Sequence, residues 1–149
     1  GVPAYNEAAN IGYLLSDLLS QTQDSFILKE IIIISDGSTD ETDNIARSFG
    51  NEKVRVIADQ KRGGKIKRLN ELFEIFTGDI LVQFDADVRL RDTSVIEEMV
   101  RPFLKDEEMA LVCGNHKPSE PKGFIERAAV FGVQVWDDAL DMLGEKDGG

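Results

Sequence analysis

Apolar positions recur along the chain at two spacings, one typical of helices and one typical of buried strands. An amphipathic helix is predicted where apolar residues recur at helical spacing, at Ile11, Leu14, Leu15, Leu18 and Leu19. The segment 30–35 contains four consecutive isoleucines. A run of β-branched residues of this length predicts a strand buried on both faces, as in a parallel sheet.

The remaining pattern continues this alternation. Further strands are predicted at 2–3, where Val2-Pro3 reads as the end of a strand, and at 54–57, 80–84 and 109–114. Ser38 and Glu41 have capping-box spacing, which predicts a helix from there to about Phe49 with Gly50 as its stop. The segment 65–76 predicts a helix with one apolar side, made by Leu69, Leu72, Phe73 and Phe76.

A further helix is predicted after Asp92-Thr93, with Pro102 as a point of kinking or early ending. The segment 124–143 has a helical pattern of apolar residues. An interface helix and a helix that covers the core are equally supported there. Strands that alternate with helices predict the α/β class, with a mostly parallel sheet and helices on both faces. Ligands of such sheets bind beyond the carboxyl ends of the strands, where the polar loops 5–7, 36–38 and 85–87 are expected to meet.

Asp85-Ala86-Asp87 follows an apolar strand, where the chain should be leaving the core. Two carboxylates two residues apart can bind one hard cation, Mg²⁺ or Mn²⁺, and leave coordination positions for water and phosphate. A solvated turn is the alternative interpretation: the triplet alone is a weak signal, and its place after a buried strand makes the two interpretations about equally supported.

Asp36 ends the most hydrophobic strand, and Gly37 after it allows close backbone approach to a ligand. Helix capping accounts for the polar residues that follow but not for an acid at Asp36, so a ligand role is favoured there. Glu7, in contrast, reads by itself as a first-turn acid behind a capping Asn6.

Five cations fall within residues 61–68 of a chain whose net charge is −11. They flank Gly63-Gly64 at a helix start, where free backbone N–H groups can bind phosphate. For Arg62 and Lys65, phosphate binding and a position on a solvated helix face are equally supported. Lys67 and Arg68 are expected on a solvated helix face. The single histidine, His116, is expected to be an unremarkable loop residue.

The overall composition narrows the class of protein. A length of 149 residues fits one soluble domain, and the acidic charge argues against nucleic-acid binding. No apolar stretch approaches the roughly 20 residues of a membrane span. The single cysteine, Cys113, excludes an internal disulfide and is expected to be a buried, inert thiol, and a reducing compartment is the default.

Four motifs in order resemble the family 2 glycosyltransferases of the GT-A fold. They are VPAYNE at 2–7, SDGSTDET at 35–42, RGGK at 62–65 with Leu69-Asn70, and GDI at 78–80 leading to FDAD at 84–87. The resemblance covers residues 1–114 and implies a nucleotide-binding half there. It implies that residues 115–149 begin an acceptor-side region, and that the chain is a fragment.

The resemblance also implies an inverting transfer from a UDP- or GDP-sugar, with Mg²⁺ or Mn²⁺ as cofactor. By motif match, the residues expected to contact the donor are Pro3, Ala4, Tyr5, Glu7, Asp36, Arg62, Lys65, Asp85 and Ala86. Asp87, together with Asp85, is expected to hold the metal. The family's catalytic base is an acid in the later half, and none stands in a matching context here, so it is expected beyond Gly149.

The resemblance leaves the acceptor open among a lipid-linked glycan, a polysaccharide and a small molecule. It implies a cytoplasmic protein, with membrane association through further segments. Two alternatives stay open: another nucleotide-binding α/β enzyme, such as a sugar nucleotidyltransferase, and a non-catalytic metal-binding module. A dinucleotide oxidoreductase is disfavoured because no G-x-G-x-x-G follows the first strand.

Overall fold

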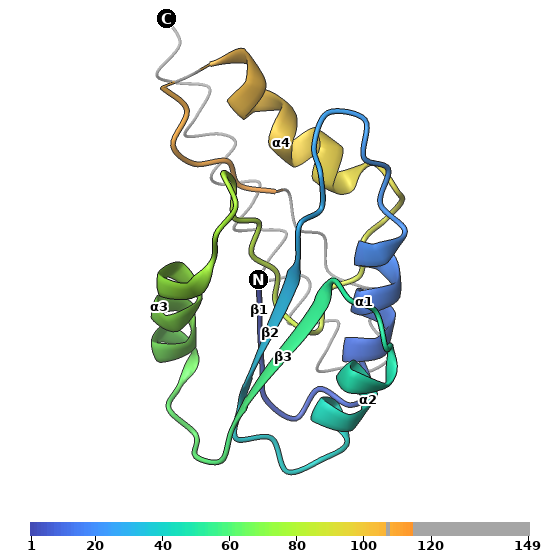
Figure 1. Cartoon of the computed structure of the whole chain (residues 1–149), viewed down its shortest axis with the longest axis vertical. Helices are drawn as coiled ribbons and strands as arrows, with labels where there is room; N and C mark the ends of the chain where they lie inside the picture. The colour runs from blue at the N-terminus through green and yellow to red at the C-terminus, as the bar shows by residue number, and fades with distance from the viewer. Residues whose placement is uncertain (107, 115–149) are drawn as a thin grey trace, which may run out of the picture. The chain divides into compact units, whose positions relative to one another are not determined.

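The computed structural model describes residues 1–106 and 108–114, and this part of the chain is built on a parallel sheet. Strands β1 (Val2–Ala4), β2 (Ile31–Asp36) and β3 (Val54–Asp59) pair in the order β1-β2-β3 (Figure 1). In the register of the two pairs, Val2 lies beside Ile33, and Asp36 lies beside Asp59. All carboxyl ends of the strands therefore point to one edge of the sheet.

The isoleucines of β2 are shared between two hydrophobic clusters, one on each face of the sheet. Ile31 and Ile33 belong to the larger cluster, which includes residues of the helix after β1. Ile32 and Ile34 pack with Leu72 in the second cluster. Successive side chains of a strand point to opposite faces, so the predicted burial of this strand on both faces is confirmed.

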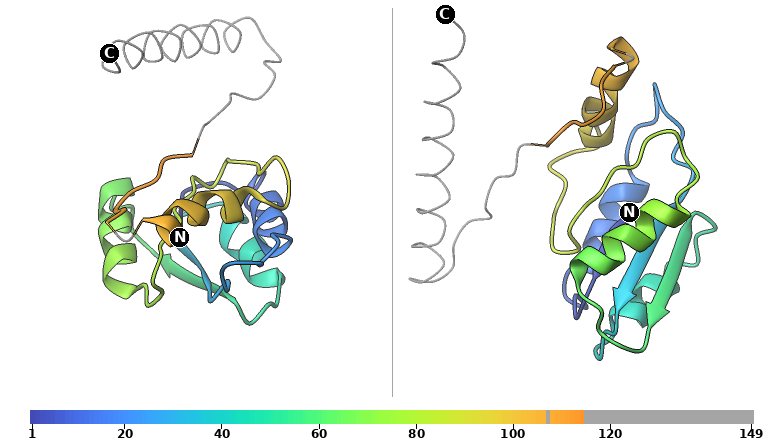
Figure 2. Two further views of the ribbon diagram at one scale, coloured as in Figure 1. Left: turned by 90° about the horizontal axis from the view of Figure 1, so that it is seen from above. Right: turned by 90° about the vertical axis from the view of Figure 1, so that its left-hand side faces the viewer.

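Helices cover both faces of the sheet, as predicted. They are α1 (Ile11–Leu19), α2 (Thr42–Ser48), α3 (Lys65–Ile75) and α4 (Val95–Lys105). Figures 1 and 2 show α3 on one face and α1 with α2 on the other. The larger cluster also contains Ile96 and Val100 of α4. Among the described residues, no helix combines the length and the apolar character that crossing a membrane requires.

The boundaries of α2 and α4 differ from the prediction in two details. Ser38 and Glu41 do not form a capping box: α2 begins at Thr42, and its N–H donates to Asp40 Oδ1 over 3.0 Å. Gly50 follows the helix with a φ of 55°, as its predicted role as a stop requires. Pro102 does not end α4, which continues to Lys105 because Ile96 and Val100 anchor it in the core.

The apolar side of α3 is narrower than predicted. Leu72 is buried, at 1% exposure, whereas Phe73 is 60% exposed. Adjacent helical residues are 100° apart, so the two cannot both face the sheet. Arg68, one turn before Leu72, takes the inward position instead.

The predicted strand 80–84 is extended chain rather than an assigned strand. It nevertheless pairs with the start of the sheet, because the Gly1 amino group donates to Val82 O over 2.7 Å and the Phe84 N–H donates to Gly1 O over 3.0 Å. These two bonds follow the pattern of a parallel pair. In the described residues the pairing of this segment consists of these two bonds.

The predicted strand 109–114 is not formed, and the prediction of a buried thiol at Cys113 is wrong. The segment has no regular structure, and the Cys113 side chain is exposed. Without a ladder partner among the described residues the segment has no sheet to bury its apolar side chains, and Leu111 is 76% exposed. The predicted helix 124–143 and His116 lie outside the described residues.

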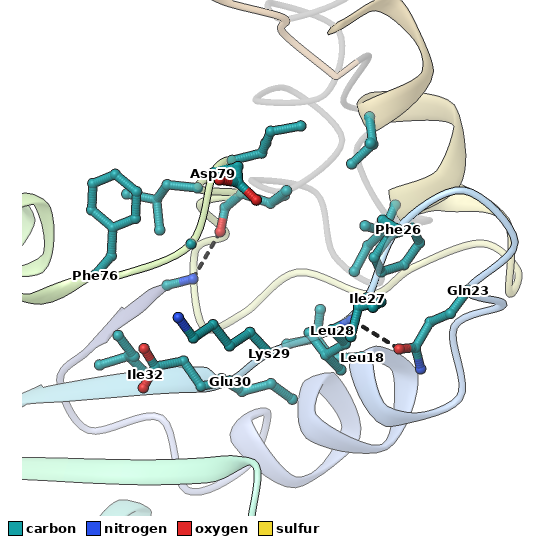
Figure 3. Close-up of a pocket in the computed structure, with 18 of the residues that line it drawn as sticks. Leu18, Gln23, Phe26, Ile27, Leu28, Lys29, Glu30, Ile32, Phe76 and Asp79 are labelled. Atoms are coloured by element: carbon teal, nitrogen blue, oxygen red, sulfur yellow. Dashed lines mark hydrogen bonds between the residues drawn. The ribbon is translucent and has the colours of Figure 1, made fainter. Parts of the chain in front are cut away.

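An apolar cavity of about 800 Å³ lies at the amino-terminal end of β2, away from the polar loops. Figure 3 shows Leu18, Phe26, Leu28 and Phe76 around it. Its lining contains no residue of the loops 5–7, 36–38 and 85–87. The cavity is therefore separate from the edge at which the candidate residues meet.

Candidate functional site

Two of the three polar loops are joined by hydrogen bonds at the carboxyl edge of the sheet. The Asn6 N–H donates to Ser38 Oγ over 3.1 Å, and the Glu7 N–H donates to Thr42 Oγ1 over 2.7 Å. Asn6 Oδ1 in turn accepts from the Thr39 N–H over 2.8 Å. Asn6 has a φ of 55°, a conformation that asparagine tolerates better than most residues. The polar residues after β2 thus hold the first loop rather than only capping a helix.

Asp36 stands at the centre of this edge, and its carboxylate is engaged by three protein donors. Oδ1 accepts from the Gly63 N–H over 2.6 Å and from Arg68 Nε over 2.7 Å, and Oδ2 accepts from the Gly64 N–H over 2.9 Å. Burial acts to raise the pKa of Asp36, but the hydrogen bonds from Gly63, Arg68 and Gly64 outweigh it and keep the pKa below its ordinary value. Asp36 is therefore held as a carboxylate, and at 4% exposure it is almost closed to solvent.

Arg68 is buried at 2% exposure, so the prediction of a solvated face is wrong for this residue. Its guanidinium meets three carboxylates: Asp36, Asp59 Oδ2 at 2.8 Å and Glu71 Oε2 at 2.7 Å. Burial acts to lower the pKa of Arg68, but bonds to Glu71, Asp36 and Asp59 raise it above its ordinary value. The position of Arg68 one turn before Leu72, on the buried side of α3, is the sequence signal that could have located it.

The basic loop, residues 60–64, carries Arg62 towards the first polar loop. The Arg62 guanidinium lies over the Tyr5 ring, 3.9 Å from its centroid. This cation–π contact leaves the exposed guanidinium beside the edge formed by β1 and β2. Two residues predicted to contact the same ligand are therefore in contact with each other.

Lys65, the first residue of α3, reaches the third polar loop. Its Nζ lies 2.6 Å from Asp85 Oδ1, and the two side chains are 57% and 47% exposed. The Val88 N–H donates to Asp85 O over 3.2 Å, which closes a turn over the triplet. The start of α3 and the acidic triplet are thus neighbours at one edge, although Lys65 and Asp85 lie 20 residues apart in sequence.

The triplet itself combines one buried residue with two accessible acids. Ala86 is 5% exposed and belongs to the larger core cluster, so it anchors the turn. Asp87 is exposed and makes no hydrogen bond or ion pair with another residue in the described part of the chain. Within residues 1–106 and 108–114 no group of three or more acidic, histidine or cysteine side chains is arranged to hold a metal ion. Asp85 Oδ1 is paired with Lys65, so Asp87 is the acid of the triplet that is free in the described residues. Carboxylate oxygens suit Mg²⁺ or Mn²⁺, which also keep water and phosphate oxygens as ligands.

The other predicted contact residues lie close to this edge. Pro3 is partly buried in β1, and Ala4 is 4% exposed within the core cluster, which leaves only its backbone for a ligand. Glu7 Oε2 accepts from Asn10 Nδ2 over 2.8 Å at the start of α1. The interpretation of Glu7 as a first-turn acid behind a capping Asn6 is wrong, because α1 begins at Ile11 after Asn10 and has no acid in its first turn.

The Gly37 backbone, directly after β2, lies very close to the backbone of the basic loop. Replacement of Gly37 by alanine tests this close approach. Gly37 has a φ of 72°, and an added Cβ would lie 2.8 Å from Arg62 N. We expect Gly37→Ala to lower the free energy of unfolding by about 1–3 kcal/mol, measured by urea denaturation. The control is Gly12→Ala in α1, where an added Cβ would make contact at 3.4 Å and alanine favours the helix. Equal effects of the two changes would contradict the close approach.

Comparison with known proteins places this arrangement in a family. The family described as "Glycosyl transferase family 2" matches residues 1–140. A human dolichyl-phosphate beta-glucosyltransferase is 27% identical over 139 residues, which are 85% of this chain and 43% of the relative.

Two solved structures show the same fold. A mannosyltransferase from Pyrobaculum calidifontis, in complex with GDP-Man and Mn²⁺, is 27% identical with a TM-score of 0.61, over 68% of this chain and 30% of that one. A glucosyl-3-phosphoglycerate synthase from Mycobacterium tuberculosis, in complex with Mn²⁺, UDP and phosphoglyceric acid, is 27% identical with a TM-score of 0.60, over 71% of this chain and 38% of that one. The fold is thus of the predicted GT-A type, and this chain spans less than half the length of each of these relatives.

Proposed function

Because the chain belongs to glycosyl transferase family 2, we propose that it forms the donor-binding part of a glycosyltransferase. Its substrate in this proposal is a nucleoside-diphosphate sugar, UDP- or GDP-linked, and the transfer inverts the anomeric carbon. One observation carries the proposal: the basic loop brings Arg62 to Tyr5 while the adjoining Lys65 reaches Asp85, at one edge of the sheet.

Each part of this edge suits a different part of the donor. Tyr5, with the guanidinium of Arg62 on its ring, offers a flat surface for the nucleoside. By motif match, Asp36 is assigned to the base or the ribose of the donor. Lys65 and the free N–H groups at the start of α3 suit the diphosphate. In a chain of net charge −11, such a local arrangement is what an anionic ligand requires.

Asp87 and Asp85 are the residues that would hold the divalent cation in this proposal. A cation bound there would neutralise the charge that develops on the diphosphate leaving group. Asp87 is exposed, and Ala86 fixes the turn in the core, so the carboxylates do not depend on a mobile segment for their position. The carboxylates supply hard oxygen ligands, which favours Mg²⁺ or Mn²⁺ over softer metals.

For the acceptor we propose a chemical class rather than a single compound. The human relative is named for dolichyl phosphate, and we therefore put a lipid-linked acceptor first, ahead of a polysaccharide or a small molecule. Such an acceptor would place the protein at the cytoplasmic face of a membrane.

Ligand-dependent thermal unfolding tests the donor proposal. We expect Mn²⁺ with either UDP or GDP to raise Tm, because a ligand at 100 times its Kd stabilises the folded state by about 2.7 kcal/mol. Asp87→Ala should remove the dependence of this shift on Mn²⁺. The matched control is Asp79→Ala, an exposed acid at the rim of the apolar cavity (Figure 3).

Three outcomes would contradict parts of the proposal. No shift with any nucleotide would exclude the donor site and favour a metal-binding module. A shift that does not depend on Mn²⁺ would keep the nucleotide site and remove the role of Asp87. Loss of the shift in Asp79→Ala would show that the effect is not specific to the triplet.

A further inference from the structure

Arg68 joins four parts of the fold through one buried side chain. Its Nε donates to Asp36 at the end of β2, and its Nη2 lies 2.8 Å from Asp59 Oδ2 at the end of β3. The Nη2 group also donates to Lys61 O in the basic loop over 3.0 Å, and Nη1 donates to Glu71 on α3. A guanidinium has five donors in a rigid plane, so one residue can fix all these groups relative to one another.

The same cluster holds the basic loop at both of its ends. Arg68 fixes the loop at Lys61, and Asp36 accepts from the Gly63 and Gly64 N–H groups. Between these fixed points lies Arg62, and directly after them lies Lys65. The loop is otherwise exposed and has no hydrophobic anchor among its own side chains.

From this geometry we propose that Arg68 is a positioning residue, which holds the basic loop so that Arg62 lies on Tyr5 and Lys65 reaches Asp85. The inference rests on the donor site proposed above and adds a residue that does not itself contact the donor. Asp36 has two partners in this arrangement, because it anchors both Arg68 and the glycine amides.

The charge of the cluster explains why an arginine suits this position. Asp36, Asp59 and Glu71 surround one guanidinium, so the cluster would repel an anionic ligand if Arg68 were neutral. Hydrogen bonds from Arg68 hold the pKa of Asp59 below its ordinary value. A lysine would keep the charge but could not reach several acceptors in fixed directions.

Two variants separate positioning from simple stabilisation. Arg68→Lys keeps the charge and loses the planar fork, and Arg68→Gln loses both. The matched control is Glu97→Gln in α4, because Glu97 is 8% exposed and accepts hydrogen bonds from Ser25 N–H and Oγ, away from the candidate site. Urea denaturation of all variants ranks their global stability.

Limited trypsin cleavage of the ligand-free protein reports the order of the loop. Mass spectrometry quantifies cleavage after Lys61 and after Arg62. We expect the rate at these bonds to rise about tenfold in Arg68→Lys and further in Arg68→Gln, since cleavage follows the population of the opened loop. Glu97→Gln should leave the rate at these two bonds unchanged when compared at a temperature well below its Tm.

Nucleotide binding provides the second measurement. Isothermal titration with UDP or GDP should show Kd in Arg68→Lys weakened about tenfold, which is 1.4 kcal/mol, with the dependence on Mn²⁺ retained because Asp87 is intact. Unchanged cleavage and unchanged Kd in both Arg68 variants would overturn the inference. If the unmodified protein binds no nucleotide, the donor proposal fails, while the cleavage rates still decide whether Arg68 holds the loop.

Discussion

Replacement of Arg68 by methionine is expected to lower the free energy of unfolding by about 3–5 kcal/mol. Removal of one partner from a buried ion pair leaves the other as an uncompensated buried charge. Here the remaining charge would be on Asp36, whose side chain is 6% exposed. A typical domain is stable by only about 5–15 kcal/mol, so this single change removes a large share of the total. Urea denaturation monitored by circular dichroism measures the loss.

Replacement of Asp36, the other partner of this ion pair, should lower the free energy of unfolding by less. Asp36→Asn leaves Arg68 with Asp59 and Glu71, both partly exposed, so its charge stays compensated. We expect a loss of about 1–3 kcal/mol, because the Gly63 and Gly64 N–H groups bond to different oxygens of Asp36 and the single amide oxygen of asparagine can accept from only one of them.

A double-mutant cycle makes the asymmetry testable. The variant with both Arg68→Met and Asp36→Asn should lose clearly less stability than the sum of the two single losses, because no buried charge is left without a partner. Additive losses would mean that the two residues act independently and that the contact between them contributes little. Phe73→Ala, on the exposed side of the same helix, serves as the control for changes in α3 itself.

The elements that the sequence predicts correctly are those with a strong local pattern. The four isoleucines of β2 and the apolar stripe of α1 leave one interpretation each, and both segments are buried as expected. The order of polar loops after the strands also follows from local pattern, since parallel strands bring their carboxyl ends to one edge. The family resemblance agrees with this arrangement.

What the sequence does not predict depends on partners that are distant in the chain. Arg68 is buried only because Asp36 and Asp59, on two neighbouring strands, meet its guanidinium. Ser38 looks like a helix cap, yet its hydroxyl holds the Asn6 N–H instead. In both cases a polar side chain has several local uses, and the tertiary contact decides among them. The metal role of Asp85 and Asp87 stays a prediction.

Strand prediction fails for a related reason. Segments 80–84 and 109–114 have apolar sequences, but a strand is defined by its partner. The first pairs with Gly1 through two hydrogen bonds, and the second has no ladder partner among the described residues. Apolar pattern alone therefore predicts extended chain better than it predicts a paired strand.

The second large loss of stability is expected from a substitution at Leu72, which differs sharply in burial from its neighbour Phe73. Leu72 is 1% exposed and packs with Ile32 and Ile34 between α3 and the sheet, whereas Phe73 is 60% exposed. We expect Leu72→Ala to lower the free energy of unfolding by about 2–5 kcal/mol, through lost apolar contacts and the cavity left behind. The second cluster is small, so few neighbours are able to move into the space.

Phe73→Ala is the matched control, because it removes a larger side chain from the adjacent position of the same helix. An exposed side chain contributes little, so its loss should change the stability by no more than about 0.5 kcal/mol. Both values come from urea denaturation under the same conditions. A loss at Phe73 as large as that at Leu72 would mean that the outer face of α3 is covered in solution. The packed side of α3 would then be as wide as the sequence pattern predicts, and the inward position of Arg68 would need another explanation.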